Sequence, residues 1–220
     1  MSFPDDSLNS PASRPEPELP RVSRPFEWVP IRSLAARHRP RIAAHLLALG
    51  EHDRYLRFGY AAADEQVRKY VDRIDFDRDE IFGVFNRRLE LIALAHLAYE
   101  PEPEGGADPA RATSAEFGVS VAMHARGRGY GARLFDHAVL RARNRRVETI
   151  VIHALTENEA MLRIVRNAGA TIEHMGGDAE ASLRLPPESF ASLVAGVVEQ
   201  QLGELDYRFK QGALESRPPA

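Results

Sequence analysis

The stretch Arg126-Gly127-Arg128-Gly129-Tyr130-Gly131 follows a strand-like run, 115–123, and opens a helix-like run that ends near Arg146. Closely spaced glycines let the backbone approach a ligand, and the unpaired N–H groups at a helix N-terminus attract phosphate oxygens. We therefore interpret this turn as a cradle for a pyrophosphate group. The expected contacts are the guanidinium groups of Arg126 and Arg128 and the backbone N–H groups of Gly127, Gly129, Gly131 and Ala132.

Two other phosphate-binding motifs fit this turn less well. The dinucleotide fingerprint G-x-G-x-x-G has an acidic residue about twenty positions later, at the end of a second strand. Here the glycines follow G-x-G-x-G, and Glu148 ends a highly basic helix instead. The P-loop requires Gly-Lys-Ser or Gly-Lys-Thr, and neither tripeptide occurs in the sequence. The motif alone does not decide the ligand, because glycine clusters also occur in plain turns.

The composition is typical of one globular domain. The chain has 220 residues, 44% of them apolar and 28% charged, which is enough for one substantial core. A net charge of −3 and a pI near 6.3 argue against a general nucleic-acid binder. The absence of cysteine excludes disulfides, thiolate nucleophiles and zinc–thiolate sites. With no signal sequence and no apolar run of about 18 residues, we expect a soluble, cytoplasmic protein.

The histidines do not predict a metal site. His38, His45 and His52 recur every seven residues. Paired metal ligands on a helix prefer i,i+4 spacing together with a third ligand, and Pro40 interrupts the presumed helix. We therefore expect no metal.

The pattern along the chain divides it into three parts. Residues 1–24 are rich in Pro, Ser, Glu and Arg and are predicted to be disordered. Residues 25–187 form the folded domain, and residues 188–220 form a C-terminal helix and tail. Within the domain we predict strands at 26–32, 80–85, 90–99, 115–123, 149–155, 170–175 and 181–185, and helices at 42–49, 64–74, 129–146 and 157–168. This order predicts an α/β (α+β) fold with a mixed, mostly antiparallel sheet and helices on both faces.

The C-terminal segment carries one apolar stripe. From Phe190 to Phe209, apolar residues recur at steps of 3, 4 and 7, as on one side of an amphipathic helix. Such a stripe packs on its own domain or, as the alternative, on a second copy of the chain in a homodimer. The polar side mixes acidic and basic residues, which argues against a membrane-surface helix.

The order of elements resembles the GNAT family of acyl-CoA-dependent N-acetyltransferases. The residues that carry the resemblance are Arg126-x-x-Gly129-x-Gly131 at the strand-to-helix turn and Asn158, which opens the next helix. The resemblance covers residues 25–187 and implies a GNAT-like fold, acetyl-CoA as the cosubstrate and an amine as the acceptor. Two short segments, Tyr55-Leu56-Arg57-Phe58 and Ala115-Glu116-Phe117, look like the acetyltransferase domains of bacterial protein-lysine acetyltransferases.

The strand before the glycines predicts a groove for the coenzyme arm. By strand alternation, Phe117, Val119 and Val121 share one face, while Glu116, Gly118 and Ser120 share the other. We expect the second face to be uncrowded, so that a pantetheine arm lies along the strand and pairs with its backbone near Val119 and Val121. The resemblance implies that the strand splays or bulges here, which frees those backbone groups.

Glu116 is the candidate general base. A lysine-type amine has a pKa near 10.4, so its attack on a thioester requires a proton acceptor nearby. Glu116 acts directly or through water, or else is only an exposed or ion-paired strand carboxylate. The resemblance implies that Asn158 contacts the pantetheine or strand, with a role at its helix N-terminus as the alternative. It also implies that Tyr55 and Arg57 contribute to the acceptor-side wall, with anchoring of their loop as the alternative.

The predicted reaction is direct acetyl transfer in a ternary complex, because the sequence has neither a cysteine nor a Gly-x-Ser-x-Gly elbow. Many GNAT enzymes use a Tyr four residues before the helix-ending glycine to protonate the CoA thiolate. That position is Val165 here, which leaves Ser120, a water molecule or direct departure of the thiolate. We predict a protein lysine as the acceptor. The alternatives are a small amine or amino acid, a non-catalytic acyl-CoA-binding sensor, and a dinucleotide-binding protein.

Overall fold

The computed structural model describes residues 29–100, 113–185 and 210. In this part of the chain the strands are β1 (Ile31–Leu34), β2 (Glu80–Phe85), β3 (Leu91–Tyr99), β4 (Ser114–Val121), β5 (Thr149–Leu155), β6 (Thr171–Met175) and β7 (Asp178–Arg184). The helices are α1 (Arg39–Leu47), α2 (Glu51–Phe58), α3 (Asp64–Arg73), α4 (Tyr130–Asn144) and α5 (Glu159–Asn167). Two 3₁₀ turns, η1 (Ala36–His38) and η2 (Met123–Ala125), precede α1 and α4.

The strands form one seven-stranded sheet in the order β1-β2-β3-β4-β5-β7-β6. Neighbouring strands run antiparallel except β4 and β5, which are parallel, so the predicted mixed, mostly antiparallel sheet is confirmed. The parallel pairing joins only 114–116 to 149–151, although both strands continue beyond it. After Glu116, β4 stays paired with β3 but has separated from β5. This separation is the splay that the resemblance implied.

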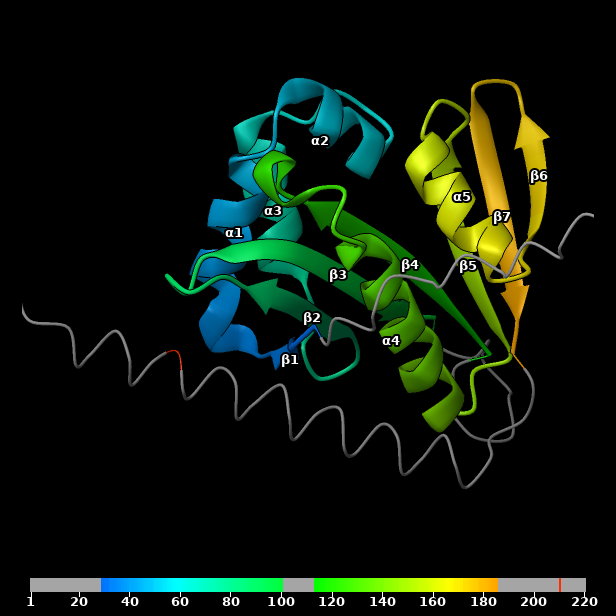
Figure 1. Ribbon diagram of the computed structural model, residues 1–220, viewed down its shortest axis with the longest axis horizontal. Helices are drawn as coiled ribbons and strands as arrows, with labels where there is room; N and C mark the ends of the chain where they lie inside the picture. Colours follow the sequence, from blue (N-terminus) through cyan, green and yellow to red (C-terminus); the bar gives the residue numbers. More distant parts are fainter. Residues whose placement is uncertain (1–28, 101–112, 186–209, 211–220) are drawn as a thin grey trace, which may run out of the picture.

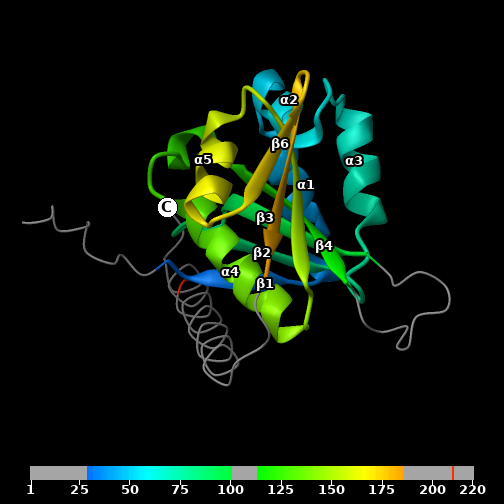
Figure 2. The same ribbon diagram turned by 90° about the vertical axis from the view of Figure 1, so that its right-hand side faces the viewer.

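Helices cover both faces of the sheet. Figure 1 shows α1, α2 and α3 grouped together at one end of the sheet, and Figure 2, turned by 90°, shows α4 and α5 on the opposite face from α1 and α3. Each face has its own apolar core. Ile81 belongs to the core under α1 and α3, and its neighbour Phe82 to the core under α4. This division follows from the alternation of side chains along β2, in which successive residues point to opposite faces.

Most predicted elements match the structure, but β1 (Ile31–Leu34) shares only residues 31 and 32 with the predicted strand 26–32, and one helix was not predicted. The predicted strand 149–155 is β5 itself, and α1 begins at Arg39, with Pro40 in its first turn. α2 was not among the predicted helices; it follows Gly50 and ends at Phe58, and its C-cap residue Gly59 has a φ of +77°. Because α2 has no buried residue, it lacks the continuous apolar stripe by which helices are recognised.

The start of α3 agrees with the predicted helix, which began at residue 64. Its N-cap residue is Ala63, and the backbone N–H of Ala63 donates to Gln66 Oε1 at 2.8 Å. Asp64 is the first helical residue, where its negative charge favours the positive end of the helix dipole.

Several predictions concern residues outside the described part of the chain. These are the disorder of residues 1–24 and the C-terminal helix with its homodimer contact. Among the described helices, none combines the length and the hydropathy needed to cross a membrane.

Candidate active site

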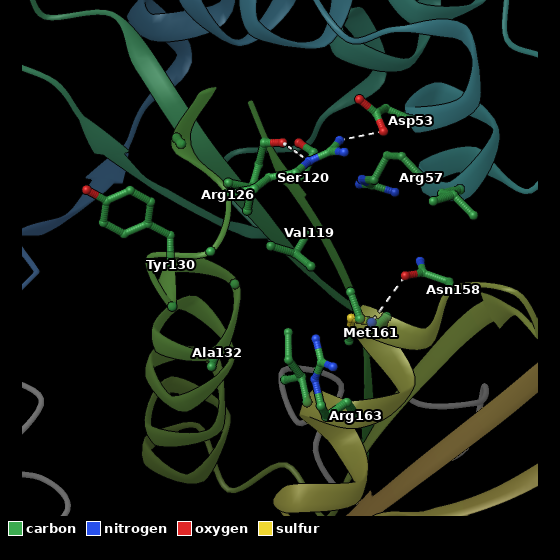
Figure 3. Close-up of a pocket in the computed structure, with 18 of the residues that line it drawn as sticks. Asp53, Arg57, Val119, Ser120, Arg126, Tyr130, Ala132, Asn158, Met161 and Arg163 are labelled. Carbon is green, nitrogen blue, oxygen red and sulfur yellow. Dashed lines mark hydrogen bonds and ion pairs between the residues drawn. The ribbon is translucent and has the colours of Figure 1, made fainter. Parts of the chain in front are cut away.

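A pocket of about 790 Å³ lies beside the segment of β4 that has separated from β5. Its walls come from α2, the end of β4, the loop before α4, the first turn of α4, and α5, as Figure 3 shows. This volume is typical of small-molecule sites. The predicted site residues that line it are Arg57, Val119, Val121, Arg126, Gly127, Gly129, Gly131, Ala132 and Asn158.

The loop between η2 and α4 has the geometry of an anion cradle. Gly127 and Gly129 have φ values of +73° and +78°, in the left-handed region that other residues rarely adopt. Gly129 is the N-cap residue of α4, so the first N–H groups of the helix lie at the pocket without intrahelical partners. An added Cβ on Gly131 would lie 3.2 Å from Cδ1 of Ile164, so glycine also keeps α4 close to α5. These features suit a diphosphate.

Arg126 is engaged by Asp53 of α2 at the rim of the pocket. Its Nη2 forms an ion pair with Asp53, and its Nε donates to the carbonyl oxygen of Val121 at 3.4 Å, as Figure 3 shows. This pair joins α2 to the glycine loop, and nothing in the local sequence pattern indicated it. Arg128 is exposed and does not line the pocket, so its predicted phosphate contact stays a prediction.

Asn158 is the N-cap residue of α5. Its Oδ1 accepts a hydrogen bond from the backbone N–H of Met161 at 3.1 Å (Figure 3). Asn158 therefore has the alternative role that we considered, in which its side chain caps the N-terminus of α5. Within the described residues the side-chain Nδ2 has no hydrogen-bond partner, which leaves two N–H donors for a ligand in the pocket that Asn158 lines.

Both faces of β4 are occupied by side chains. Phe117 packs edge-on against Phe135 of α4, with ring centroids 5.0 Å apart. On the opposite face, Arg57 lies over Gly118, and Ser120 is hydrogen-bonded to His45 of α1. The expectation of an uncrowded face was therefore wrong. The reason is that α1 and α2 pack onto this face and bring the two long side chains with them.

Ser120 and His45 form a buried hydrogen-bonded pair, with 8% and 5% of their surfaces exposed. His45 Nε2 lies 2.8 Å from Ser120 Oγ, and His45 Nδ1 lies 2.8 Å from the carbonyl oxygen of Leu91. Burial lowers the pKa of His45 to about 4, so the imidazole is neutral at pH 7. The Leu91 carbonyl only accepts, which assigns the imidazole proton to Nδ1 and leaves Nε2 to accept from the Ser120 hydroxyl.

Glu116 and Tyr55 lie outside the lining of the pocket. Glu116 is exposed on β4, on the face that also carries Gly118 and Ser120. Tyr55 is half-buried on α2. The base role of Glu116 and the acceptor-wall role of Tyr55 stay predictions. Arg57, the other predicted wall residue, does line the pocket.

The pocket also contains residues that sequence reasoning missed. Helical spacing offered one signal, because Met161, Ile164 and Ala168 recur at steps of three and four on the pocket side of α5. Val165, the position of the family Tyr, is fully buried. No group of three or more His, Asp or Glu side chains that could hold a metal ion occurs in the described ranges. Other lining residues that were not predicted are Leu49, Asp53, Leu56, Ala125, Tyr130, Asp136, Ala160, Arg163 and Asn167.

Known proteins share this architecture. A family model described as the acetyltransferase (GNAT) family matches residues 31–170. The GNAT domain of S. lividans PAT is 21% identical, with a TM-score of 0.58 over 70% of this chain and 89% of that one. A ribosomal-protein-alanine N-acetyltransferase from Brucella melitensis is 19% identical, with a TM-score of 0.51 over 70% and 99%. None of the curated proteins is a significant match.

A third solved structure was determined with the coenzyme. It is a putative acetyltransferase from Salmonella typhimurium with its cofactor acetyl-CoA, 14% identical, with a TM-score of 0.54 over 74% of this chain and 97% of that one. The split between β4 and β5 and the glycine loop before α4 both lie within the residues that the family model matches. The chain belongs to the GNAT acetyltransferase family, whose cosubstrate is acetyl-CoA.

Proposed function

We propose that the protein transfers the acetyl group of acetyl-CoA to a primary amine by direct attack in a ternary complex. The observation that carries this proposal is the pocket that joins the glycine loop to the free edge of β4. The N–H groups at the start of α4 would hold the diphosphate. The amide of Asn158 and the strand backbone near Val119 and Val121 would hold the pantetheine. The thioester would then lie farther along β4, beside Glu116.

The role of Glu116 is to accept a proton from the acceptor. The ammonium form has no lone pair, so one proton must leave before the nitrogen attacks the thioester carbon. Because Glu116 is exposed on the acceptor-side face of β4, a water molecule can relay this proton. As the C–N bond forms, the C–S bond breaks and the sulfur leaves as thiolate. A backbone N–H between Phe117 and Val121 would stabilise the developing oxyanion.

One candidate for the general acid, Ser120, is not suited to protonate the departing thiolate. Ser120 donates its only hydroxyl proton to His45, so that proton is not free for the thiolate. Val165 offers no hydroxyl at the position of the family Tyr. The thiolate therefore departs directly or takes a proton from water, and we assign no side chain as the general acid.

Two classes of acceptor are compatible with this proposal. The fold likeness to the GNAT domain of S. lividans PAT and the resemblance of segments 55–58 and 115–117 support a protein lysine. The partly enclosed pocket supports a small amine. A panel of lysine peptides and metabolite amines, followed by thiol release from acetyl-CoA, separates the two classes.

The reaction is tested by Glu116→Gln, which keeps the size of the side chain and removes the base. We expect kcat/KM to fall about 100-fold or more, with the Kd for acetyl-CoA in calorimetry unchanged. The matched control is Glu173→Gln on β6, another exposed strand glutamate that lies outside the pocket. Full activity of Glu116→Gln would remove Glu116 from the mechanism. Coenzyme binding without turnover of any amine would instead support the acyl-CoA-binding sensor.

A further inference from the structure

Arg57 of α2 lies directly on the surface of β4. A Cβ atom added to Gly118 would sit 2.7 Å from Cζ and 2.8 Å from Nη1 of Arg57. Such distances are too short for a carbon atom, so the guanidinium group occupies the space that any other side chain at position 118 would fill. The φ of Gly118 is not in the left-handed region, and its missing side chain therefore serves close approach and not backbone conformation.

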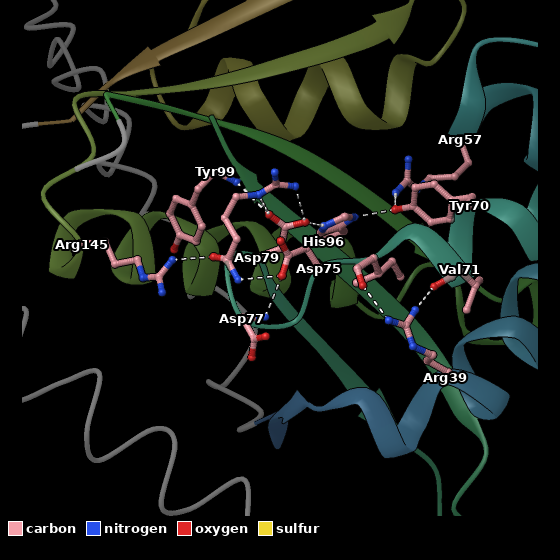
Figure 4. A network of polar contacts seen from close by, with 12 residues as sticks. Arg39, Arg57, Tyr70, Val71, Asp75, Asp77, Asp79, His96, Tyr99 and Arg145 are labelled. Atoms are coloured by element: carbon pink, nitrogen blue, oxygen red, sulfur yellow. Dashed lines mark hydrogen bonds and ion pairs between the residues drawn. The ribbon is translucent and has the colours of Figure 1, made fainter. Parts of the chain in front are cut away.

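A chain of hydrogen bonds holds this guanidinium group in place. Arg57 Nη2 donates to the Tyr70 hydroxyl at 2.7 Å, Tyr70 lies 2.7 Å from His96 Nδ1, and His96 Nε2 lies 3.0 Å from Asp79 Oδ2 (Figure 4). Burial opposes ionisation of Asp79, but hydrogen bonds from His96 and Arg78 outweigh it and lower its pKa to about 2. The Asp79 carboxylate accepts a hydrogen bond from His96 Nε2–H. Nδ1 therefore accepts a hydrogen bond from the Tyr70 hydroxyl, and the Tyr70 oxygen accepts one from Arg57.

The guanidinium group of Arg57 forms no ion pair within the described residues. No carboxylate of that part of the chain lies within 4.0 Å of its guanidinium nitrogens. Burial raises the pKa of Tyr70, so the phenol stays neutral and supplies no negative charge. Only Nη2 takes part in the chain of hydrogen bonds. Because Arg57 lines the pocket, its other N–H donors can bind a ligand there. Figure 3 shows the Arg57 side chain reaching from α2 into this space.

Acceptor groups flank this cation along the same face of β4. Ser120 gives its hydroxyl proton to His45, so towards the pocket its oxygen can only accept a hydrogen bond. Glu116 provides a carboxylate on the other side of Gly118. Residues two apart on a strand are about 6.6 Å apart. The face therefore presents acceptor, cation and acceptor in that order, an arrangement that complements a molecule with both an ammonium group and a carboxylate.

We propose that the acceptor is an amine with a carboxylate a few bonds from its nitrogen, as in a free amino acid, and that Arg57 binds this carboxylate. The inference rests on the proposed acetyl transfer and names its substrate class. A guanidinium fork matches a carboxylate in a bidentate geometry. Along β4, Gly118 precedes the last residue of the strand by three positions, or about 10 Å.

The test compares each amino acid with the amine formed by removing its carboxylate. Three such pairs are phenylalanine and phenethylamine, leucine and 3-methylbutylamine, and lysine and cadaverine. For at least one pair, we expect the protein to favour the amino acid by about 100-fold in kcat/KM. Removal of one partner from a buried charge pair weakens binding by a factor of this order. In Arg57→Gln, we expect this ratio to fall to about 1, mainly through a higher KM for the amino acid.

Two further variants test whether a change in this ratio is specific to the position of the Arg57 guanidinium group. Arg68→Gln removes an exposed arginine of α3 that lies outside the pocket, and it should keep the wild-type ratio. Gly118→Ala retains Arg57 but displaces its guanidinium group, and it should lower the ratio like Arg57→Gln. Circular dichroism checks the fold of each variant, so either Arg57→Gln or Gly118→Ala can decide the question if the other fails to fold.

Binding gives a readout that does not depend on turnover. Calorimetry on the complex with CoA should detect the amino acid in the wild type and a Kd about 100-fold weaker in Arg57→Gln. If the amino acid binds but no acetyl transfer occurs, the proposed reaction fails while the assignment of Arg57 stands. A ratio near 1 in the wild type, equal losses for both members of a pair, or turnover of lysine peptides above free amino acids would each overturn the assignment.

Discussion

Protonation of His45 should govern much of the acid sensitivity of this protein. The imidazole is 5% exposed, and burial lowers its pKa from 6.5 to about 4. In the unfolded chain the pKa returns to 6.5, so between these two values the unfolded state binds more protons than the folded state. Stability is then fully present above pH 6.5 and is lost as the pH falls towards 4. The shift corresponds to about 3 kcal/mol of unfolding free energy.

The measurement is urea unfolding, followed by far-UV circular dichroism at pH 7.5 and at pH 4.5. Other groups also titrate in this range; burial, for example, lowers the pKa of His38. The variant His45→Gln therefore serves as the reference, because its amide does not titrate and the remaining groups are common to both proteins. At pH 7.5 the wild type should be the more stable protein. By pH 4.5 its advantage should shrink by about 2.5 kcal/mol, because the pH is still above the folded-state pKa of about 4.

A second variant separates burial from histidine chemistry in general. His52 is exposed on α2, so His52→Gln should show the same difference from the wild type at both pH values. If the unfolding free energies of the wild type and His45→Gln fall in parallel between pH 7.5 and 4.5, the reasoning about the buried neutral imidazole is refuted.

Three other substitutions test separate contacts. In Gly83→Ala, the new Cβ would lie 2.6 Å from the carbonyl oxygen of Ala93, which is backbone and cannot move cheaply. We expect urea unfolding to show a loss of about 1–3 kcal/mol, and an unchanged midpoint would contradict this. Asp53→Asn removes the partner of Arg126, so acetyl-CoA should bind about 5-fold tighter in calorimetry; weaker binding would mean that Asp53 orients Arg126 for the coenzyme. Asn158→Ala removes the cap of α5 and should cost about 1 kcal/mol in thermal unfolding of the free protein; no loss would show that the cap is not needed.

Local patterns were sufficient for the elements that build the coenzyme side of the pocket. Alternation identified β4 and β5, and the glycines placed the turn before α4. These features depend on dihedral preferences and hydrogen bonds within a few residues, which a linear sequence records directly. The same patterns missed α2, because a helix without buried residues carries no apolar period.

The sequence by itself therefore determined the order of the elements, the glycine loop and the family to which they point. Only the tertiary structure decided what surrounds the acceptor. Ser120 forms a hydrogen bond with His45, which is 75 residues away in the sequence, and Arg57 lies over Gly118. Both contacts arise only because α1 and α2 pack on this face of β4. Hydrogen-bond polarity and charge pairing at these contacts depend on which side chains the packing brings together. No local periodicity encodes such encounters, and they decide which chemical group the pocket accepts.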